Sequence, residues 1–268
     1  MCAVTHPLLL GGERAATQLC ELGVRRGGVL LVHASMRATG ASAWCMTEAL
    51  RRALGPEGTV VVPAFTPENS DTSRSYLERV RGLSEKARAA MRAAMPAFDP
   101  VTSPAPGMGA LAETVRQAPG AMRSGHPQTS FAALGPAAGK LLTGHHRDCH
   151  LGEDSPLARL YEADAQVLQL GTGFDSCTAF HLAEYRRPSP PRRLYRCVVA
   201  SEDGPRWWEY EDIALDDSDF GALGDDFARA RSREVRTGHV GSAPSRLFPL
   251  RAAVDFAGGW LRVHRTEG

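Results

Sequence analysis

Four short apolar runs along the chain predict strands that are buried inside the protein. They cover residues 29–35 (VLLVHAS), 58–65 (GTVVVPAF), 130–135 (SFAALG) and 165–171 (AQVLQLG). Nearly continuous runs of this length are typical of strands covered on both faces, because strands with one solvated face alternate apolar and polar residues. The first run ends in small and polar residues and Pro63 stops the second, so polar groups follow the buried segments.

Helical spacings of apolar residues separate these runs. One pattern covers residues 13–28 and ends at Gly23, and another covers 46–55 and ends at Gly55. A strand, a helix and a second strand in this order predict a βαβ unit, in which the strands are parallel and helices cover both faces of the sheet. The fold class expected from the pattern is therefore α/β with a mainly parallel central sheet.

Two segments depart from this alternation. Residues 67–98 are charged and rich in alanine, which predicts one or two mobile helices inserted before the Pro- and Gly-rich turn at 99–109. From residue 194 apolar residues alternate on two arms, which predicts a β-hairpin with Asp203 and Gly204 as its turn pair. No long linker divides the chain, so we expect a single domain over residues 1–268 in which 67–98 forms a lid.

Composition and charge narrow the classes of protein. The chain has 268 residues, of which 43% are apolar and 23% charged, and its formal net charge is +1. These values are typical of a folded globular protein and do not indicate a nucleic-acid partner, although the basic cluster at 186–193 leaves a local contact open. No run approaches the ~20 apolar residues of a membrane span, and residues 1–14 lack the basic start of a secretory signal. We expect a cytoplasmic protein without a nucleic-acid or membrane partner.

The cysteines and histidines give little indication of a metal. Six cysteines are scattered without CxxC pairs, which argues against a disulfide framework or a zinc ribbon. Residues 145–150 (HHRDCH) gather three histidines and a cysteine, but not at the spacing of a structural zinc motif. We expect a polar surface loop and no metal site, with a metal-dependent amide hydrolase as a remote alternative.

Candidate catalytic residues follow the ends of the predicted strands. In sheets of this kind ligands bind beyond the carboxyl ends of the strands, where residues 33–37 (HASMR), 63–69 (PAFTPEN) and 171–185 supply polar groups. If a helix starts within the last of these, His181 and Glu184 are i and i+3 and share a face. A carboxylate that holds an imidazole raises its basicity, as a general base requires. A buried histidine satisfied by a glutamate fits the spacing equally well.

No protein nucleophile accompanies this pair. There is no G-x-S-x-G elbow, and Ser176 precedes His181 by only five residues. A phosphate-binding GxxxxGK[ST] loop, an HExxH helix and a convincing GxGxxG after the first strand are also absent from the sequence. A base without a nucleophile suits the deprotonation of a substrate amine or hydroxyl that attacks a bound, activated acyl group. The pattern therefore favours direct acyl transfer.

Several longer motifs, in order along the chain, resemble the aminoglycoside 3-N-acetyltransferase family. They are LLVHASMRATG, ALGPEGTVVVPAFT, FDPVTSPAPGMGALAETVRQAPGAMRSGHPQTSFAALGPAA, GEDSPLARLYEADAQVLQLGTGFDSCTAFHLAEY and VGSAPSRLFPLRAAVDFAGGW. Together they cover most of the chain, and the block over 98–185 is the most specific. The resemblance implies a three-layer α/β/α sandwich with the β-hairpin as a C-terminal addition. It also implies acetyl transfer from acetyl-CoA to an amine of an antibiotic, and hence resistance.

The resemblance also implies roles for individual residues. His181 would take the proton from the attacking amine and Glu184 would orient its ring, while Thr178 would contact the thioester or the pantetheine arm. Backbone N–H groups before the helix at 109 would suit a pyrophosphate. The full set implied at acetyl-CoA is His33, Ser35, Met36, Arg37, Ser103, Met108, Gly109, Arg123, His126, Ser130, Phe131 and Thr178.

The acceptor site is expected to be acidic and partly aromatic, because aminoglycosides carry several ammonium groups. The candidates that would bind the acceptor are Thr66, Glu68, Asp71, Asp175, Glu211 and Asp212, with Trp207, Trp208 and Tyr210 on the hairpin arm.

The segment at 67–98 does not suit a cationic drug, because it carries many arginines. It would instead close over the phosphates of CoA, or indicate an acceptor that is anionic or neutral. The alternatives are therefore an acetyltransferase of a biosynthetic or self-protection pathway that acts on another amine, and a non-catalytic CoA-binding protein. The expected partner is a small-molecule amine, and the protein is expected to be a monomer or homodimer.

Overall fold

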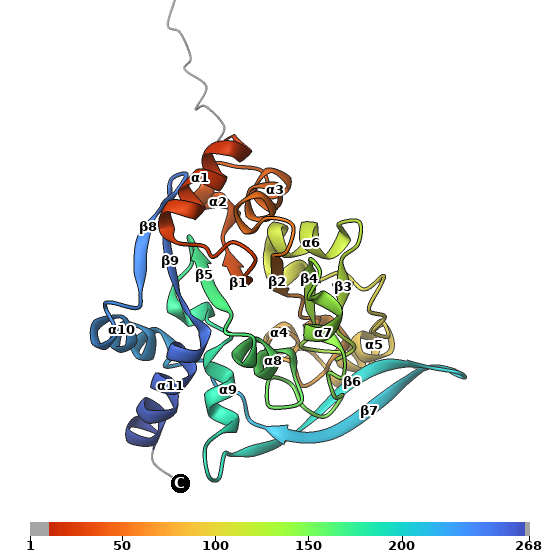
Figure 1. Ribbon diagram of the computed structural model, residues 1–268. Coiled ribbons are helices and arrows are strands. Elements are labelled where there is room, and N and C mark those ends of the chain that lie inside the picture. The colour runs from red at the N-terminus through yellow and green to blue at the C-terminus, as the bar shows by residue number, and fades with distance from the viewer. Residues whose placement is uncertain (1–10, 266–268) are drawn as a thin grey trace, which may run out of the picture.

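A seven-stranded sheet runs through the middle of the protein (Figure 1). In the computed structural model, which describes residues 11–265, its strands are β1 (Val29–Ala34), β2 (Thr59–Pro63), β3 (Met122–Arg123), β4 (Phe131–Leu134), β5 (Gln166–Leu170), β8 (Arg236–Val240) and β9 (Ala243–Pro249). They lie in the order β3-β4-β2-β1-β5-β9-β8. β1 pairs in parallel with β2 and β5, and the outer strands pair antiparallel. The parallel relation that the apolar runs predict therefore holds for the three central strands.

Helices cover both faces of the sheet, which makes the three-layer α/β/α sandwich. One face packs against α1 (Gly12–Leu22), α3 (Ala43–Leu54) and α6 (Gly109–Gln117). The other packs against α7 (Ala138–Leu142), α8 (Pro156–Glu162), α9 (Phe180–Tyr185), α10 (Phe220–Ala230) and α11 (Leu250–His264). The remaining helical elements are α2 (Met36–Thr39), α4 (Arg74–Arg79), α5 (Glu85–Ala93), η1 (Pro67–Asn69), η2 (Pro106–Met108) and η3 (Phe174–Ser176). The α/β class and its layers are confirmed.

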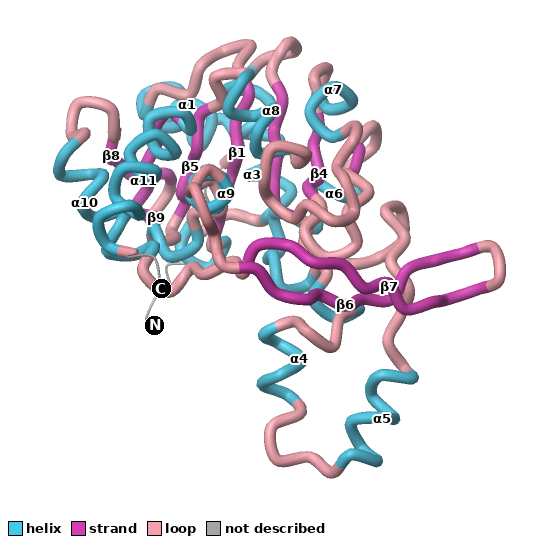
Figure 2. The backbone as a smooth tube through the Cα atoms, turned by 90° about the horizontal axis from the view of Figure 1, so that it is seen from below, coloured by secondary structure: helices cyan, strands magenta, loops and turns pink. Residues whose placement is uncertain are grey.

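The predicted hairpin consists of β6 (Arg192–Ser201) and β7 (Gly204–Ile213), and it extends away from the sandwich beside α4 and α5 (Figure 2). The prediction of its turn was wrong by one residue. Ser201 pairs with Gly204, so Glu202 and Asp203 connect the strands, and Gly204 follows them with a positive φ of 107°. The chain then returns to the central sheet, where β9 and β8 extend it beyond β5.

The insertion at 67–98, where one or two helices were predicted, forms α4 and α5 and is hydrogen-bonded to the hairpin. Ser70 Oγ donates to the Arg196 carbonyl over 2.6 Å, and Phe98 N donates to the Val198 carbonyl over 3.1 Å.

None of the helices within residues 11–265 combines the length and the apolar character that a membrane span requires.

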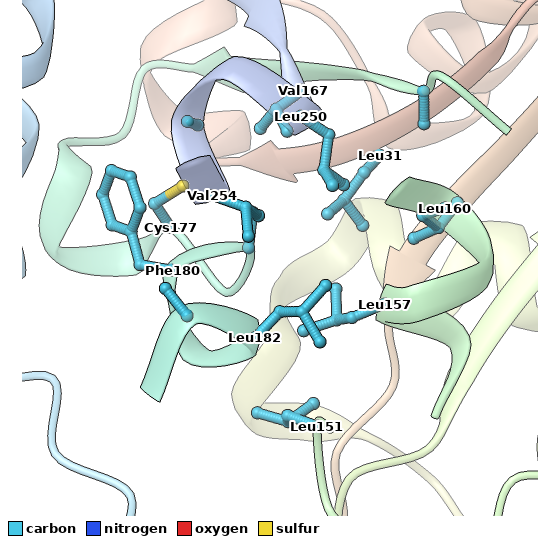
Figure 3. Close-up of a cluster of buried hydrophobic side chains, with 14 of the residues drawn as sticks. Leu31, Leu151, Leu157, Leu160, Val167, Cys177, Phe180, Leu182, Leu250 and Val254 are labelled. Atoms are coloured by element: carbon cyan, nitrogen blue, oxygen red, sulfur yellow. The ribbon is translucent and has the colours of Figure 1, made fainter. Parts of the chain in front are cut away.

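The core between the sheet and α8, α9 and α11 fixes the helix that carries the candidate base. Phe180 and Leu182 of α9 lie in this core with Leu157 of α8 and Val254 of α11 (Figure 3). All four side chains are buried. Burying large side chains on both sides of His181 stabilises α9 in one orientation.

Candidate active site

α9 presents His181 at the edge of the core, where its ring packs against Phe220 at a centroid distance of 4.7 Å. Its neighbours Phe180, Leu182 and Ala183 are fully buried, whereas 12% of the His181 side chain is exposed. The predicted i, i+3 hydrogen bond is present, with His181 Nδ1 2.5 Å from Glu184 Oε2. Because an ionised carboxylate only accepts, Nδ1 carries the hydrogen and Nε2 is left with the lone pair.

Glu184 is itself held in place by groups from the far end of the chain. Its Oε1 accepts from Arg265 Nη1 and from the Asp216 backbone N–H, the latter over 3.2 Å. Arg265 also donates from Nε to Asp219 Oδ2 over 2.8 Å. The Glu184 side chain is only 3% exposed, so its charge depends on these partners. The pair at 181 and 184 is therefore part of a network that reaches from α9 to the residue after α11.

A narrow cavity of about 370 Å³ opens on one side of His181. It lies at the carboxyl ends of β1 and β2, between the start of α6 and the segment that leads into α9. Its walls are mainly apolar and are formed by Val32, His33, Ala34, Val62, Pro63, Phe65, Gly107, Met108, Leu111, Ala112, Thr172, Asp175, Ser176, Cys177, Thr178, His181 and Asp217.

His33 is a buried polar group on the wall of this narrow cavity. The residue is 7% exposed, and its Nε2 has no hydrogen-bond partner among the described residues. Burial, and to a lesser extent the nearby His181, lower the pKa of His33 to about 4. Its imidazole is therefore neutral at physiological pH and is available to bond a polar group of a ligand.

A wide cavity of about 740 Å³ opens on the other side of His181. α4 and the residues after it form one wall, and the hairpin base forms another. Four residues line both cavities: Phe65, Met108, His181 and Asp217. The other residues of the wide cavity are Pro67, Ser73, Arg74, Ser75, Leu77, Glu78, Arg81, Gln128, Thr129, His150, Leu151, Arg193, Tyr195 and Leu215. A base thus lies at the junction of a narrow cavity and a wider one whose lining includes more charged side chains.

Only some of the residues implied at acetyl-CoA line the narrow cavity in the structure. His33, Met108 and Thr178 line the narrow cavity, and Gly109, with a φ of +85°, follows Met108 at the start of α6. Ser35, Met36 and Arg37 lie at and after the carboxyl end of β1, around α2, and do not line it.

The other implied residues are engaged with protein groups. The Arg123 guanidinium donates to Ser130 Oγ over 2.9 Å and to the backbone carbonyls of Ala64 and Ser103. Ser130 and Phe131 are fully buried. This network ties β3 and β4 to the residue that follows β2.

The residues implied at the acceptor are not gathered on the wide cavity. Asp175 lines the narrow cavity instead. Asp71 is paired with Arg196, and Glu211 with Arg192 over 3.2 Å.

Three further residues of this set are buried or partly buried. Thr66 Oγ1 donates to the Pro127 carbonyl over 2.6 Å, and Glu68 Oε2 is buried without a partner among the described residues. Asp212 accepts from the His150 backbone N–H over 2.8 Å and from the Tyr185 hydroxyl over 2.5 Å.

The loop at 145–150 differs from the polar surface loop that was predicted. His145 and His150 are buried, because both rings pack against His126, at centroid distances of 4.8 and 4.7 Å. Burial lowers the pKa of His145 to about 4 and that of His126 and His150 well below the usual value. Within residues 11–265 no group of three or more His, Cys, Asp or Glu side chains is arranged to hold a metal ion.

Two residues of the narrow cavity, Leu111 and Asp217, were not singled out by any sequence pattern, because only the fold brings them to the site. Phe65 and Thr172, by contrast, lie in the segments 63–69 and 171–185, which the sequence analysis placed at the carboxyl ends of strands. Of the arginines at the wide cavity, Arg74 and Arg81 belong to the basic insertion and Arg193 to the basic cluster at 186–193, but their position at the cavity was not predictable from spacing.

Comparisons with known proteins point to one family. A family model described as aminoglycoside 3-N-acetyltransferase matches residues 31–262. Aminoglycoside N(3)-acetyltransferase VII of Streptomyces paromomycinus is 35% identical over 95% of this chain and 93% of its own length. The crystal structure of YokD from Bacillus subtilis has a TM-score of 0.86 at 35% identity, covering 94% of this chain and 98% of its own. The structure of AAC-IIIb binary with CoASH has a TM-score of 0.81 at 30% identity, covering 96% and 98%.

Proposed function

This chain belongs to the aminoglycoside 3-N-acetyltransferase family, and from that membership we propose that it transfers an acetyl group from acetyl-CoA directly to an amine held beside His181. Membership makes the chain an acyltransferase that uses acetyl-CoA. The observation that carries the proposal is the position of His181, which lines both cavities and is held by Glu184.

The narrow cavity fits the pantetheine arm of acetyl-CoA, which is a slender chain with amide groups. A Cβ at Gly107 would meet no atom within 4 Å, so this wall leaves open space beside the backbone. The buried His33 Nε2 has no partner within residues 11–265 and would bond a polar group of the arm. Bound there, acetyl-CoA supplies an activated acetyl group close to His181.

His181 acts as the general base in this proposal. Since Nδ1 donates to Glu184, Nε2 is the nitrogen that takes a proton from the acceptor amine as the amine attacks the acetyl carbon. The C–S bond of the thioester then breaks, and CoA leaves as a thiolate that takes up the proton from the imidazolium or from water. The Glu184 carboxylate stabilises the imidazolium that forms, and the ion pair with Arg265 holds that carboxylate in position. No protein nucleophile is required, because the amine attacks directly.

The acceptor occupies the wide cavity. Family membership favours the 3-amine of an aminoglycoside, and acetylation there would confer resistance. A different amine, from a biosynthetic or self-protection pathway, is the second candidate. The arginines of the wide cavity favour it, because an aminoglycoside brings several positive charges of its own.

Turnover of acetyl-CoA with a panel of aminoglycosides and other amines, followed by release of the CoA thiol, tests the proposal. His181→Ala should lower kcat by about 10²- to 10⁴-fold with CoA affinity retained. His239→Ala, at an exposed position on β8, is the matched control and should leave kcat unchanged. Equal rates in wild type and His181→Ala would contradict the proposed base. CoA binding with no turnover of any amine would instead indicate a non-catalytic CoA-binding protein.

A further inference from the structure

We propose that Arg193 and Arg81 form an anion-binding subsite in the wide cavity, and that the acceptor is an amine that also carries a carboxylate, phosphate or phosphonate group. This inference rests on the proposed acetyl transfer and names the class of its acceptor. It is carried by the charges that line the cavity and by how each of them is engaged.

Three guanidinium groups and two carboxylates line the wide cavity. Arg74 and Asp217 neutralise each other, with Arg74 Nη2 2.8 Å from Asp217 Oδ1. Glu78 is the second carboxylate and is exposed, as Arg81 and Arg193 are. Among the described residues, no carboxylate oxygen lies within 4.0 Å of the guanidinium nitrogens of Arg81 or Arg193. The cavity therefore keeps two guanidinium charges without an ion-pair partner, against a single carboxylate.

Arg193 is held in a fixed position without being neutralised. Its Nη2 donates to the Thr72 carbonyl over 2.8 Å, and its Cζ lies 4.2 Å from the centroid of the Tyr195 ring. Tyr195 is 4% exposed, so the ring beneath the guanidinium is a fixed part of the hairpin base. Nε and Nη1 have no hydrogen-bond partner among the described residues and are free to donate to an oxyanion. A planar guanidinium matches the geometry of a carboxylate or phosphoryl group.

The carboxylates expected to attract a polycation are directed elsewhere. Asp71 pairs with Arg196 and Glu211 pairs with Arg192, and neither carboxylate lines the wide cavity. A ligand with several ammonium groups would meet the unneutralised guanidinium charges with few compensating carboxylates. An anionic group on the acceptor would neutralise them while its amine faces His181.

A matched set of amino sugars tests the subsite, because its members differ mainly in one charged group. The set is glucosamine, 2-amino-2-deoxyglucuronic acid and glucosamine 6-phosphate, with gentamicin as the polycation. For wild type, kcat/KM should be at least about tenfold higher for an anionic sugar than for glucosamine. The carboxylate and phosphate members show which oxyanion is preferred. Gentamicin should be the poorest acceptor of the four.

Variants assign the preference to the subsite. Arg193→Gln should bring the anionic and neutral sugars to similar kcat/KM, through a higher KM for the anionic sugars. Arg192→Gln removes the same charge from the adjacent residue of β6, which does not line the cavity, and should keep the wild-type ratio. Arg81→Gln should lower the ratio as well, whereas Arg79→Gln on α4 should not. Unchanged thermal unfolding of each variant shows that its fold is intact.

Acetylation of the sugars without any preference for the anionic ones would overturn the subsite and leave the proposed acetyl transfer standing. Equal effects of Arg193→Gln and Arg192→Gln, or gentamicin as the best acceptor, would overturn it too. If no sugar is acetylated, calorimetric titration of glucosamine and glucosamine 6-phosphate into the CoA-bound enzyme decides the question. Tighter binding of the phosphate that Arg193→Gln abolishes supports the subsite, and equal binding contradicts it.

Discussion

Glu184 is the residue whose charge should determine how well His181 works as a base. In Glu184→Gln an oxygen can still accept from His181 Nδ1, but the charge that stabilises the imidazolium is lost. We expect kcat to fall by about 100-fold and the midpoint of the pH–rate profile to move to lower pH. Glu153→Gln, at a surface carboxylate 2.7 Å from Arg186, is the control and should leave the profile unchanged. An unchanged pH–rate profile in Glu184→Gln would show that Glu184 stabilises the fold through its hydrogen bonds and does not affect the basicity of His181.

Gly107 tests the assignment of the narrow cavity to the acetyl donor. A Cβ at this position meets nothing within 4 Å, so Gly107→Ala should be tolerated. Gly107 is exposed where it lines the narrow cavity, so the larger side chain in Gly107→Leu should obstruct the opening of that cavity. We expect Gly107→Leu to raise KM for acetyl-CoA at least about tenfold, with thermal unfolding near that of Gly107→Ala. A raised KM for the amine alone would assign the narrow cavity to the acceptor instead.

At the scale of single residues, the sequence predicts contacts that are close along the chain better than those that are distant. His181 and Glu184 were found because a helix places i and i+3 side by side. Arg265 was not found, because it reaches Glu184 from 81 residues away. The resemblance implied Arg123 at acetyl-CoA. In the structure its guanidinium is instead hydrogen-bonded to Ser130 and to backbone carbonyls of the protein.

At the scale of elements, we expect the stability of α9 to depend on the side chains that it buries in the core. Leu182 is fully buried, and Leu182→Ala should lower the free energy of unfolding by about 2–5 kcal/mol through lost burial and a residual cavity. Leu194, on the hairpin, is 59% exposed, so Leu194→Ala should change the free energy of unfolding by no more than about 0.5 kcal/mol. Urea unfolding of both variants provides the comparison. A cost for Leu182→Ala near that of Leu194→Ala would mean that α9 is not anchored by this core.

Elements with a strong local pattern were predictable, and those stabilised by their neighbours were not. β1, β2, β4 and β5 appear as apolar runs because both of their faces are covered. β8 escaped prediction, since it lies at the edge of the sheet and exposes most of its residues. The hairpin turn was misplaced by one residue because Asp-Gly is favoured at the central positions of two-residue turns, whereas here Gly204 follows them.

At the scale of the whole molecule, the α/β/α sandwich places His181 and the narrow cavity at one end of the sheet, between helices from its two faces. The narrow cavity lies at the carboxyl ends of parallel strands, as expected for open α/β sheets, so its general location follows from the fold class. The wide cavity requires the insertion and the hairpin, and neither contributes strands to the central sheet. The acceptor side is therefore the part of the site that the sequence pattern predicts least.

Four buried histidines make the stability of the whole molecule sensitive to acid. Burial lowers the pKa of His33 and His145 to about 4, and that of His126 and His150 well below the usual value. Between pH 4 and the unfolded value near 6.5, the unfolded chain therefore binds protons that the folded chain does not, so stability falls as the pH falls. His33 and His145 alone should cost about 3 kcal/mol each over this range, a large part of a typical stability of about 5–15 kcal/mol.

Urea unfolding at pH 7.5, 6.0 and 5.0 measures this loss. His33→Gln removes one titrating group at a position where Nε2 has no partner among the described residues, so the slope of stability against pH should flatten by about 1.4 kcal/mol per unit. His239→Gln, at an exposed position, should leave the slope unchanged. A stability that stays constant from pH 7.5 to 5.0 would mean that the buried histidines take up protons without unfolding. The site would then accommodate a charged His33 beside His181, which the narrow apolar cavity argues against.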